Sequence, residues 1–99
     1  MNRWAVIFRD SAEMISVRAN KELRDKHVEY ANNHPELLIG GGLKREPDGA
    51  FCGAMWVVET DTRKDVEALI LSDPFYVAEH RSYEIFIWGK ILEDKIVTL

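Results

Sequence analysis

Two short segments of this chain are apolar at every position: residues 55–58 read Met-Trp-Val-Val, and residues 85–88 read Ile-Phe-Ile-Trp. β-Branched and aromatic residues of this kind are typical of strands. Because successive side chains of a strand point to opposite faces of its sheet, a strand that is apolar throughout has to bury both faces. The fold must therefore provide a cover on each side of the sheet.

Apolar runs and turn residues along the chain predict four strands and two helices. The strands are expected at residues 4–8, 37–43, 51–58 and 83–88, and the helices at residues 16–33, best defined from 21 onward, and from a cap within 60–62 to residue 71. We also expect a helical turn over residues 75–79, after the break at Asp73 and Pro74, and a small strand at residues 96–99. This order predicts an α+β fold, the ferredoxin-like βαββαβ arrangement, with a four-stranded antiparallel sheet and both helices on one face.

The second face of the sheet predicts self-association. Helices on one face leave the other in water, and a patch of Trp and Ile side chains there is larger than monomers usually tolerate. The alternative cover is the C-terminal tail, residues 91–99, but its charged and hydroxyl-bearing side chains make it a poor lid. We therefore expect a homodimer or a higher homo-oligomer, packed sheet to sheet.

Length and charge limit the class of protein. A chain of 99 residues predicts one domain over residues 1–99, with a core at about 4–90 and a tail at 91–99. With 17 acidic against 13 basic residues, the net charge of -4 argues against nucleic acid as a partner. No apolar run approaches the roughly 20 residues of a membrane helix, and no signal pattern opens the chain. We expect no membrane partner and a cytoplasmic location.

Three segments of the chain share a pattern with a known family. They are Arg24-Asp-Lys-His27, Leu37-Leu-Ile-Gly-Gly-Gly42 and Ser72-Asp-Pro-Phe-Tyr-Val-Ala78. Together they resemble the YCII-related (YciI-like) family over about residues 4–90. The resemblance implies a dimeric α+β barrel, similar in fold to muconolactone isomerase, with an active site that pairs His27 with Asp73. The chain departs from the family pattern in Gly40–Leu43, where a Gly-Pro step is common, and in Glu79-His80, where small residues are usual.

A histidine held by a carboxylate can act as a general base, because the carboxylate sets the tautomer and stabilises the imidazolium. In this hypothesis His27 moves the proton and Asp73 orients it. Each residue also has a structural interpretation: His27 as a surface residue of a helix, and Asp73 before Pro74 as a helix cap. The separation of the two side chains in the folded protein distinguishes these interpretations.

Five residues are predicted to bind a substrate: Arg24, Gly41, Trp56, Tyr83 and Trp88. Arg24 precedes His27 by one helical turn, where a guanidinium could hold a carboxylate or enolate, or pair with a surface acid. The glycines around Gly41 either admit a ligand against the backbone or permit a bulge. The three aromatic residues could stack on a planar substrate or could simply pack in the core.

The remaining residues with reactive side chains favour structural roles. Cys52 lies on an apolar strand, where it is interpreted as a packing residue, and it has no second cysteine to pair with. His34 and His80 are interpreted as caps or surface groups, and the histidines show no metal-ligand spacing. We therefore predict neither a metal nor an organic cofactor.

Three functions remain open from the sequence. The first is an enzyme that uses general acid-base catalysis, with lyase, isomerase or dehydrochlorinase-type chemistry on a small metabolite. The second is a non-catalytic module that binds or senses a small molecule in the same cleft. The third is cofactor-free oxygenation of a polyphenol, which requires a deep aromatic pocket.

Overall fold

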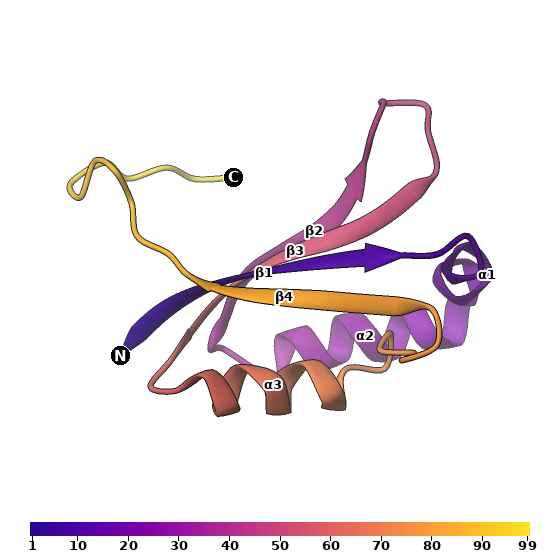
Figure 1. Cartoon of the computed structure of the whole chain (residues 1–99), viewed down its shortest axis with the longest axis horizontal. Helices are drawn as coiled ribbons and strands as arrows, with labels where there is room; N and C mark the ends of the chain where they lie inside the picture. Colours follow the sequence, from indigo (N-terminus) through magenta and orange to yellow (C-terminus); the bar gives the residue numbers. More distant parts are fainter.

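One face of a four-stranded antiparallel sheet is covered by helices in the computed structural model, which describes residues 1–99 (Figure 1). The strands are β1 (Asn2–Asp10), β2 (Leu37–Lys44), β3 (Phe51–Thr60) and β4 (Arg81–Ile87), and the helices are α1 (Met14–Ala19), α2 (Lys21–Asn32) and α3 (Arg63–Ser72). Every strand pair is antiparallel, in the order β2-β3-β1-β4. This arrangement confirms the predicted α+β, ferredoxin-like fold. None of the helices is long and apolar enough to cross a membrane.

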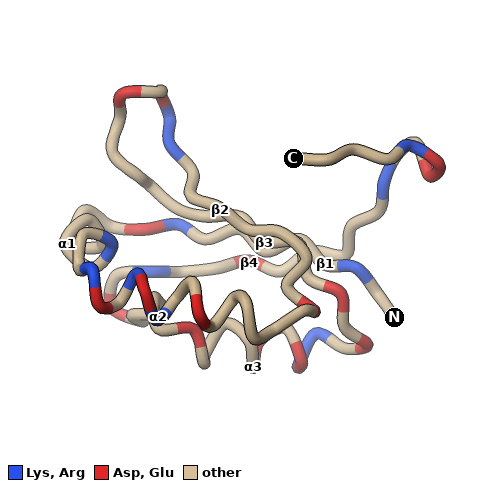
Figure 2. The backbone as a smooth tube through the Cα atoms, turned by 180° about the vertical axis from the view of Figure 1, so that it is seen from behind, with Lys and Arg blue, Asp and Glu red and all other residues tan.

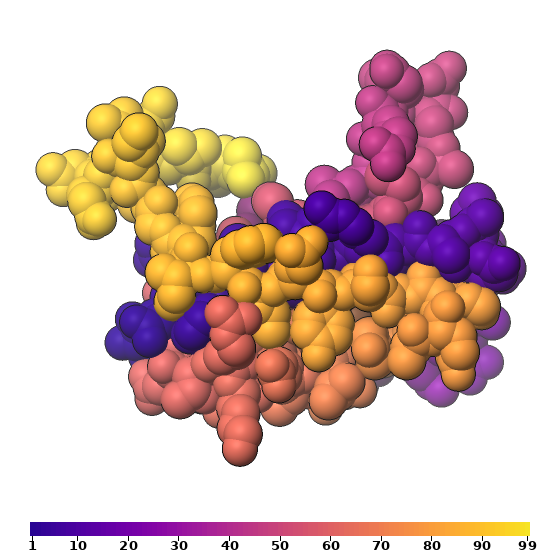
Figure 3. All heavy atoms as spheres, in the orientation of Figure 1, coloured from indigo at the N-terminus to yellow at the C-terminus, as the bar shows by residue number.

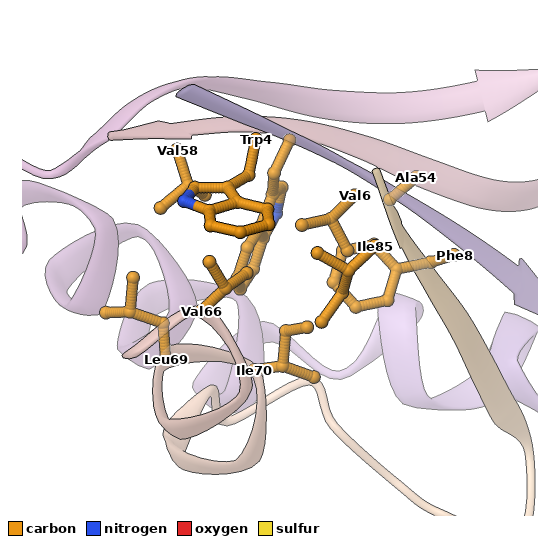
Figure 4. Packing of buried hydrophobic residues seen from close by; sticks show 10 residues of the cluster. Trp4, Val6, Phe8, Ala54, Val58, Val66, Leu69, Ile70 and Ile85 are labelled. Carbon is orange, nitrogen blue, oxygen red and sulfur yellow. The ribbon is translucent and has the colours of Figure 1, made fainter. Parts of the chain in front are cut away.

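The core lies between the sheet and α3, where alternate strand residues meet one stripe of the helix (Figure 4). In β1 the buried side chains fall at every second position, as the pleat of a strand requires. The ten residues of this cluster are Trp4, Val6, Phe8, Ala54, Trp56, Val58, Val66, Leu69, Ile70 and Ile85. The strand register places Val6 opposite both Trp56 and Ile85, so β3, β1 and β4 present one continuous apolar surface to α3.

The predicted helix over residues 16–33 is in fact two helices, separated at Asn20. The backbone of Asn20 is extended, and its side-chain oxygen accepts a hydrogen bond from the Leu23 amide at 3.1 Å. Asparagine is among the strongest N-cap residues, because its side chain satisfies an amide that has no partner within the helix. The predicted cap of the last helix is Thr62, whose hydroxyl accepts from the Asp65 amide at 3.2 Å.

Two predictions about the C-terminal half were wrong. Residues 75–79 form turns and no helix, with the Tyr76 amide donating to the Asp73 carbonyl at 2.9 Å and the His80 amide to that of Val77, also at 2.9 Å. Residues 96–99 form no strand, because the tail leaves the sheet after β4 and has no strand beside it. The tail also covers nothing, since Ile96 is 91% exposed (Figures 1 and 3).

Charged residues lie mainly in the helices, the loops and the strand ends (Figure 2). No charged residue occurs between Leu37 and Leu43 of β2, or between Phe51 and Val58 of β3. The part of the outer face formed by β2 and β3 is therefore mainly apolar and uncovered, whereas β1 and β4 carry the exposed Arg9–Glu84 ion pair on that face. Its exposed side chains include Ile39, Met55 and Phe86, which are 40%, 41% and 48% exposed.

The packing of α3 can be tested with two neighbouring residues. Ile70 is 0% exposed, whereas Leu71 is 59% exposed. We expect Ile70→Ala to lower the free energy of unfolding by about 2–5 kcal/mol, because the substitution leaves a cavity in the core. Leu71→Ala should cost less than about 1 kcal/mol. Urea denaturation followed by circular dichroism measures both values, and equal losses would contradict the assignment of the buried face.

Candidate active site

A cavity of about 260 Å³ lies between the sheet and α2. Its wall includes two arginine side chains, one from α1 and one from the start of β4. It also includes the middle of β2, a tryptophan ring of β3 and a phenylalanine ring of the turn after α3. The residues that line it are Arg18, His27, Ala31, Leu37, Gly40, Gly41, Gly42, Ala54, Trp56, Phe75 and Arg81. Drug-sized ligands occupy pockets of about 300–1,000 Å³, so this cavity suits a smaller molecule.

His27 and Asp73 are joined by a hydrogen bond of 2.7 Å between Nδ1 and Oδ1. His27 comes from α2 and lines the cavity, whereas Asp73 ends α3 and lies behind the imidazole. The side chain of Asp73 is 1% exposed and that of His27 is 26% exposed. The carboxylate is thus shielded from water, while the imidazole reaches the cavity.

The other partners of Asp73 determine which tautomer of His27 is favoured. Oδ1 also accepts the Phe75 amide at 3.1 Å, so the carboxylate acts as an acceptor. Nδ1 of His27 therefore carries the hydrogen that it donates to Asp73. In neutral His27 this leaves the lone pair on Nε2, which has no hydrogen-bond partner within the protein.

Phe75 fixes the plane of the imidazole. The two rings stack with centroids 4.3 Å apart and an interplanar angle of 18°. Phe75 follows Pro74, and its amide is held by Asp73, so the turn positions both the carboxylate and the stacking ring. The second oxygen of Asp73, Oδ2, is buried without a hydrogen-bond partner. A carboxylate in this state gains from a nearby imidazolium, because few other groups compensate for its lost hydration.

Two of the three glycines of β2 make room for neighbouring aromatic rings. A Cβ atom on Gly40 would lie 2.7 Å from Cδ1 of Trp56, and one on Gly42 would lie 2.5 Å from Cε1 of Phe51. A Cβ on Gly41 would meet nothing within 4 Å, because alternation along the strand turns it to the other face of the sheet. Gly41 lines the cavity through its backbone. The irregularities of β2 lie elsewhere, so the glycines do not mark a bulge.

Arg18, Arg81 and Asp10 form a buried charged cluster beside the cavity, and the sequence did not suggest it. Asp10 accepts two hydrogen bonds from Arg81, at 2.7 and 2.8 Å, and lies 3.5 Å from Nε of Arg18. The side chains of Arg81 and Asp10 are 1% and 0% exposed. Burial, together with the charge of Arg81, lowers the pKa of Arg18, and Asp10 opposes this shift.

The sequence would have indicated a buried Arg81 if the last strand had been predicted to begin at Arg81, where β4 begins. Arg81 shares the inward face of β4 with Tyr83 and Ile85, because side chains two apart point the same way. A charged residue on that face needs a buried partner. The predicted strand began only at Tyr83, so this position was overlooked.

Of the predicted substrate-binding residues, Trp56 and Gly41 line the cavity and three others lie outside it. The side chain of Arg24 is exposed on α2 and makes no hydrogen bond or ion pair within the protein. Tyr83 packs inward against the rings of Phe8 and Tyr76, at 6.4 and 6.0 Å. Trp88 lies beyond the end of β4 and is 42% exposed. The guanidiniums in the cavity wall therefore come from Arg18 and Arg81.

The other reactive side chains have structural contacts. Nδ1 of His34 bonds to the Tyr30 carbonyl at 2.7 Å, and the thiol of Cys52 donates to the Leu43 carbonyl at 3.5 Å. The imidazole of His80 makes no hydrogen bond within the protein. No group of three or more His, Cys, Asp or Glu side chains is arranged to hold a metal ion.

Comparisons with known proteins give a family match and several structural neighbours. The model of the YCII-related domain matches residues 3–89, and a search of curated proteins found no match. One similar solved structure is that of 5-chloro-2-hydroxyhydroquinone dehydrochlorinase from Burkholderia phenoliruptrix AC1100, in complex with 2,5-dihydroxybenzoquinone. It is 17% identical, with a TM-score of 0.74 over 88% of this chain and 93% of that chain. At this identity the likeness shows a shared fold.

The different surroundings of Gly40 and Gly41 lead to a test of the cavity wall. Gly40→Ala forces a methyl group against the rigid, buried ring of Trp56, and we expect this to destabilise the protein by about 1–3 kcal/mol. Gly41→Ala meets open space and replaces a flexible residue within a strand, so stability should be unchanged or slightly higher. Thermal unfolding of the two variants gives the comparison. A Gly41→Ala variant that is as unstable as Gly40→Ala would refute this account.

Proposed function

Because the chain belongs to the YCII-related family, we propose that it is an enzyme that transfers a proton to or from a small metabolite. His27 is the general base and acid, and Asp73 is its positioning residue. The chemistry is of the lyase, isomerase or dehydrochlorinase type and relies on protein side chains alone. The observation that carries this proposal is the 2.7 Å bond from the buried carboxylate of Asp73 to a histidine on the cavity wall.

The proposed reaction begins at Nε2 of His27. This nitrogen takes a proton from the substrate, while Nδ1 keeps its hydrogen bond to Asp73. The resulting imidazolium is stabilised by the buried carboxylate. In an isomerisation the proton returns at another atom of the substrate. In an elimination the electron pair that is released forms a double bond and expels a leaving group, such as chloride.

The size of the cavity and the structural relative support a small, ring-shaped substrate. The relative of the same fold is a dehydrochlorinase bound to 2,5-dihydroxybenzoquinone, a single oxygenated ring. The cavity of about 260 Å³ is of a size for such a molecule, and Trp56 and Phe75 supply flat apolar walls.

Screening with chlorinated hydroquinones, hydroxylated aromatics and lactones tests this proposal. We expect His27→Ala to lower kcat by about 10²–10⁴-fold and added imidazole to restore part of the activity, because the small molecule can take the place of the lost side chain. Asp73→Asn keeps an acceptor for the Phe75 amide but removes the charge, so kcat should also fall. His80→Gln, which changes a histidine outside the cavity wall, is the matched control.

The non-catalytic alternative has a separate outcome in the same experiment. If a compound binds the cavity with no turnover, and His27→Ala leaves its affinity unchanged, the protein is a binding or sensing module. Turnover that survives His27→Ala would remove His27 from the mechanism.

A homodimer is part of the same proposal. The face of the sheet opposite the helices is mainly apolar apart from the Arg9–Glu84 ion pair, and the tail leaves it open. The tail and the β2–β3 hairpin rise on either side of this face (Figure 3). A second copy packed sheet to sheet would remove the exposed Met55 and Phe86 from water. A cytoplasmic location is proposed with it, and the unpaired Cys52 agrees with a reducing compartment.

Charge introduced on the uncovered face should prevent the association. We expect the wild-type chain to have the mass of a dimer and Met55→Glu or Phe86→Glu to shift it to a monomer, because a carboxylate in an apolar interface loses its hydration. Val28→Glu is the control, since Val28 is a 58% exposed apolar residue on α2. Light scattering after size-exclusion chromatography measures the masses. A monomeric wild-type chain would disprove the dimer.

A further inference from the structure

The charged cluster beside the cavity contains more positive than negative charge. Two guanidiniums, those of Arg18 and Arg81, face one carboxylate, that of Asp10. Arg81 and Asp10 already form a complete two-bond pair with almost no exposure. Arg18 joins this pair only through a long contact of 3.5 Å. Its charge is therefore held near the charge of Arg81 without a close counter-ion of its own.

Each of these guanidiniums has one nitrogen without an acceptor. Arg81 uses Nε and Nη2 for Asp10, and Arg18 uses Nη2 for the Gly53 carbonyl at 2.7 Å. Nη1 of each residue makes no hydrogen bond within the protein, and both residues line the cavity. Nη1 of Arg18 lies beside Gly42, where an added Cβ would be only 3.2 Å away. Gly42 and Arg18 both belong to the cavity wall, so this nitrogen lies at the edge of the cavity.

The structural contacts of Arg18 do not explain why a charged side chain occupies this position. Its bond to Gly53 and its position 4.6 Å from the ring of Phe51 tie α1 to β3. A neutral donor could make that bond without bringing a second positive charge next to Arg81. Burial and Arg81 both lower the pKa of Arg18, which shows that its charged form is disfavoured by these surroundings. An anion in the cavity would offset both effects.

We propose that the end of the cavity formed by Arg18 and Arg81 binds an oxyanion of the ligand, such as a carboxylate, enolate or phenolate. The two free Nη1 nitrogens can donate hydrogen bonds to its oxygen atoms, as guanidiniums commonly do with carboxylates. Asp10 fixes Arg81 and leaves one positive charge in excess. His27 lines the same cavity, so the anion is bound near the group that moves the proton. The inference rests on the proposed function only in using this shared cavity.

Matched pairs of small molecules test the inference without turnover. We would measure the binding of benzoate against benzamide and of crotonate against crotonamide by calorimetry in a buffer low in chloride. The members of each pair are nearly equal in shape and differ in charge. We expect the wild-type protein to bind the anion about tenfold more tightly or better, the effect of one charge-assisted hydrogen bond. Added sodium chloride should weaken the binding of the anion and leave the binding of the amide unchanged.

Variants of Arg18 test whether this residue causes the preference for the anion. Arg18→Gln should bring the affinities for anion and amide close together, and Arg18→Lys, which keeps the charge but not the fork, should retain part of the difference. Arg45→Gln is the control with the same change of charge, since Arg45 is exposed on the β2–β3 loop. Circular dichroism confirms that each variant folds. If Arg18→Gln does not fold, the wild-type comparison of anion with amide still decides the question.

Failure of this inference is distinct from failure of the proposed function. Equal affinity for anion and amide, or no saturable binding of either anion up to millimolar concentration, overturns the anion site. If Arg18→Gln still prefers the anion over the amide, the preference arises from other residues, and this result also overturns the inference. His27→Ala should keep the preference while turnover is lost. Turnover that persists in that variant would reject the role of His27 and leave the anion site standing.

Discussion

The attachment of α2 to the rest of the protein depends on the hydrogen bond between His27 and Asp73. No residue of α2 is fully buried, in contrast to α3, which inserts three side chains into the core. Polar links between the two helices supplement the packing of the partly buried Tyr30 against the core cluster. Besides the 2.7 Å bond of His27, the hydroxyl of Tyr30 donates to the Leu69 carbonyl at 2.6 Å. Burial and the charge of Asp73 raise the pKa of Tyr30, so its hydroxyl keeps the proton that it donates.

The cavity follows from this arrangement. A helix packed through large apolar side chains would fill the space beneath it, whereas α2 contributes His27 and Ala31 to a wall that stays open. The sheet contributes glycines at the facing positions, where the rings of Trp56 and Phe51 occupy the volume that a side chain would need. The same bond thus holds the helix, orients the imidazole and preserves the space next to it.

The sequence predicted the strands well because their apolar runs and the turns between them are local signals. The break at Asn20 was missed because the apolar pattern continues across it, and only the cap geometry shows two helices. The pairing of His27 with Asp73 came from the family resemblance, since their side chains meet only through the tertiary fold. Arg18 and Arg81 were missed for the same reason: they are 63 positions apart in the sequence, and Asp10 connects them. Arg24 was favoured because it precedes His27 by one helical turn. Its side chain is nevertheless exposed and lies outside the cavity wall.

The wall that α2 gives to the cavity can change at little structural cost. The hydrophobic core lies between the sheet and α3, on the other side of the molecule's helical layer from the cavity wall that α2 forms. Substitution of an α2 residue that lines the cavity and does not contact the core therefore alters the shape and polarity of the cavity without disturbing the core packing. Ala31 is the clearest example, because it borders the cavity and does not belong to the core cluster. Core packing and cavity shape thus depend in large part on different helices, α3 and α2.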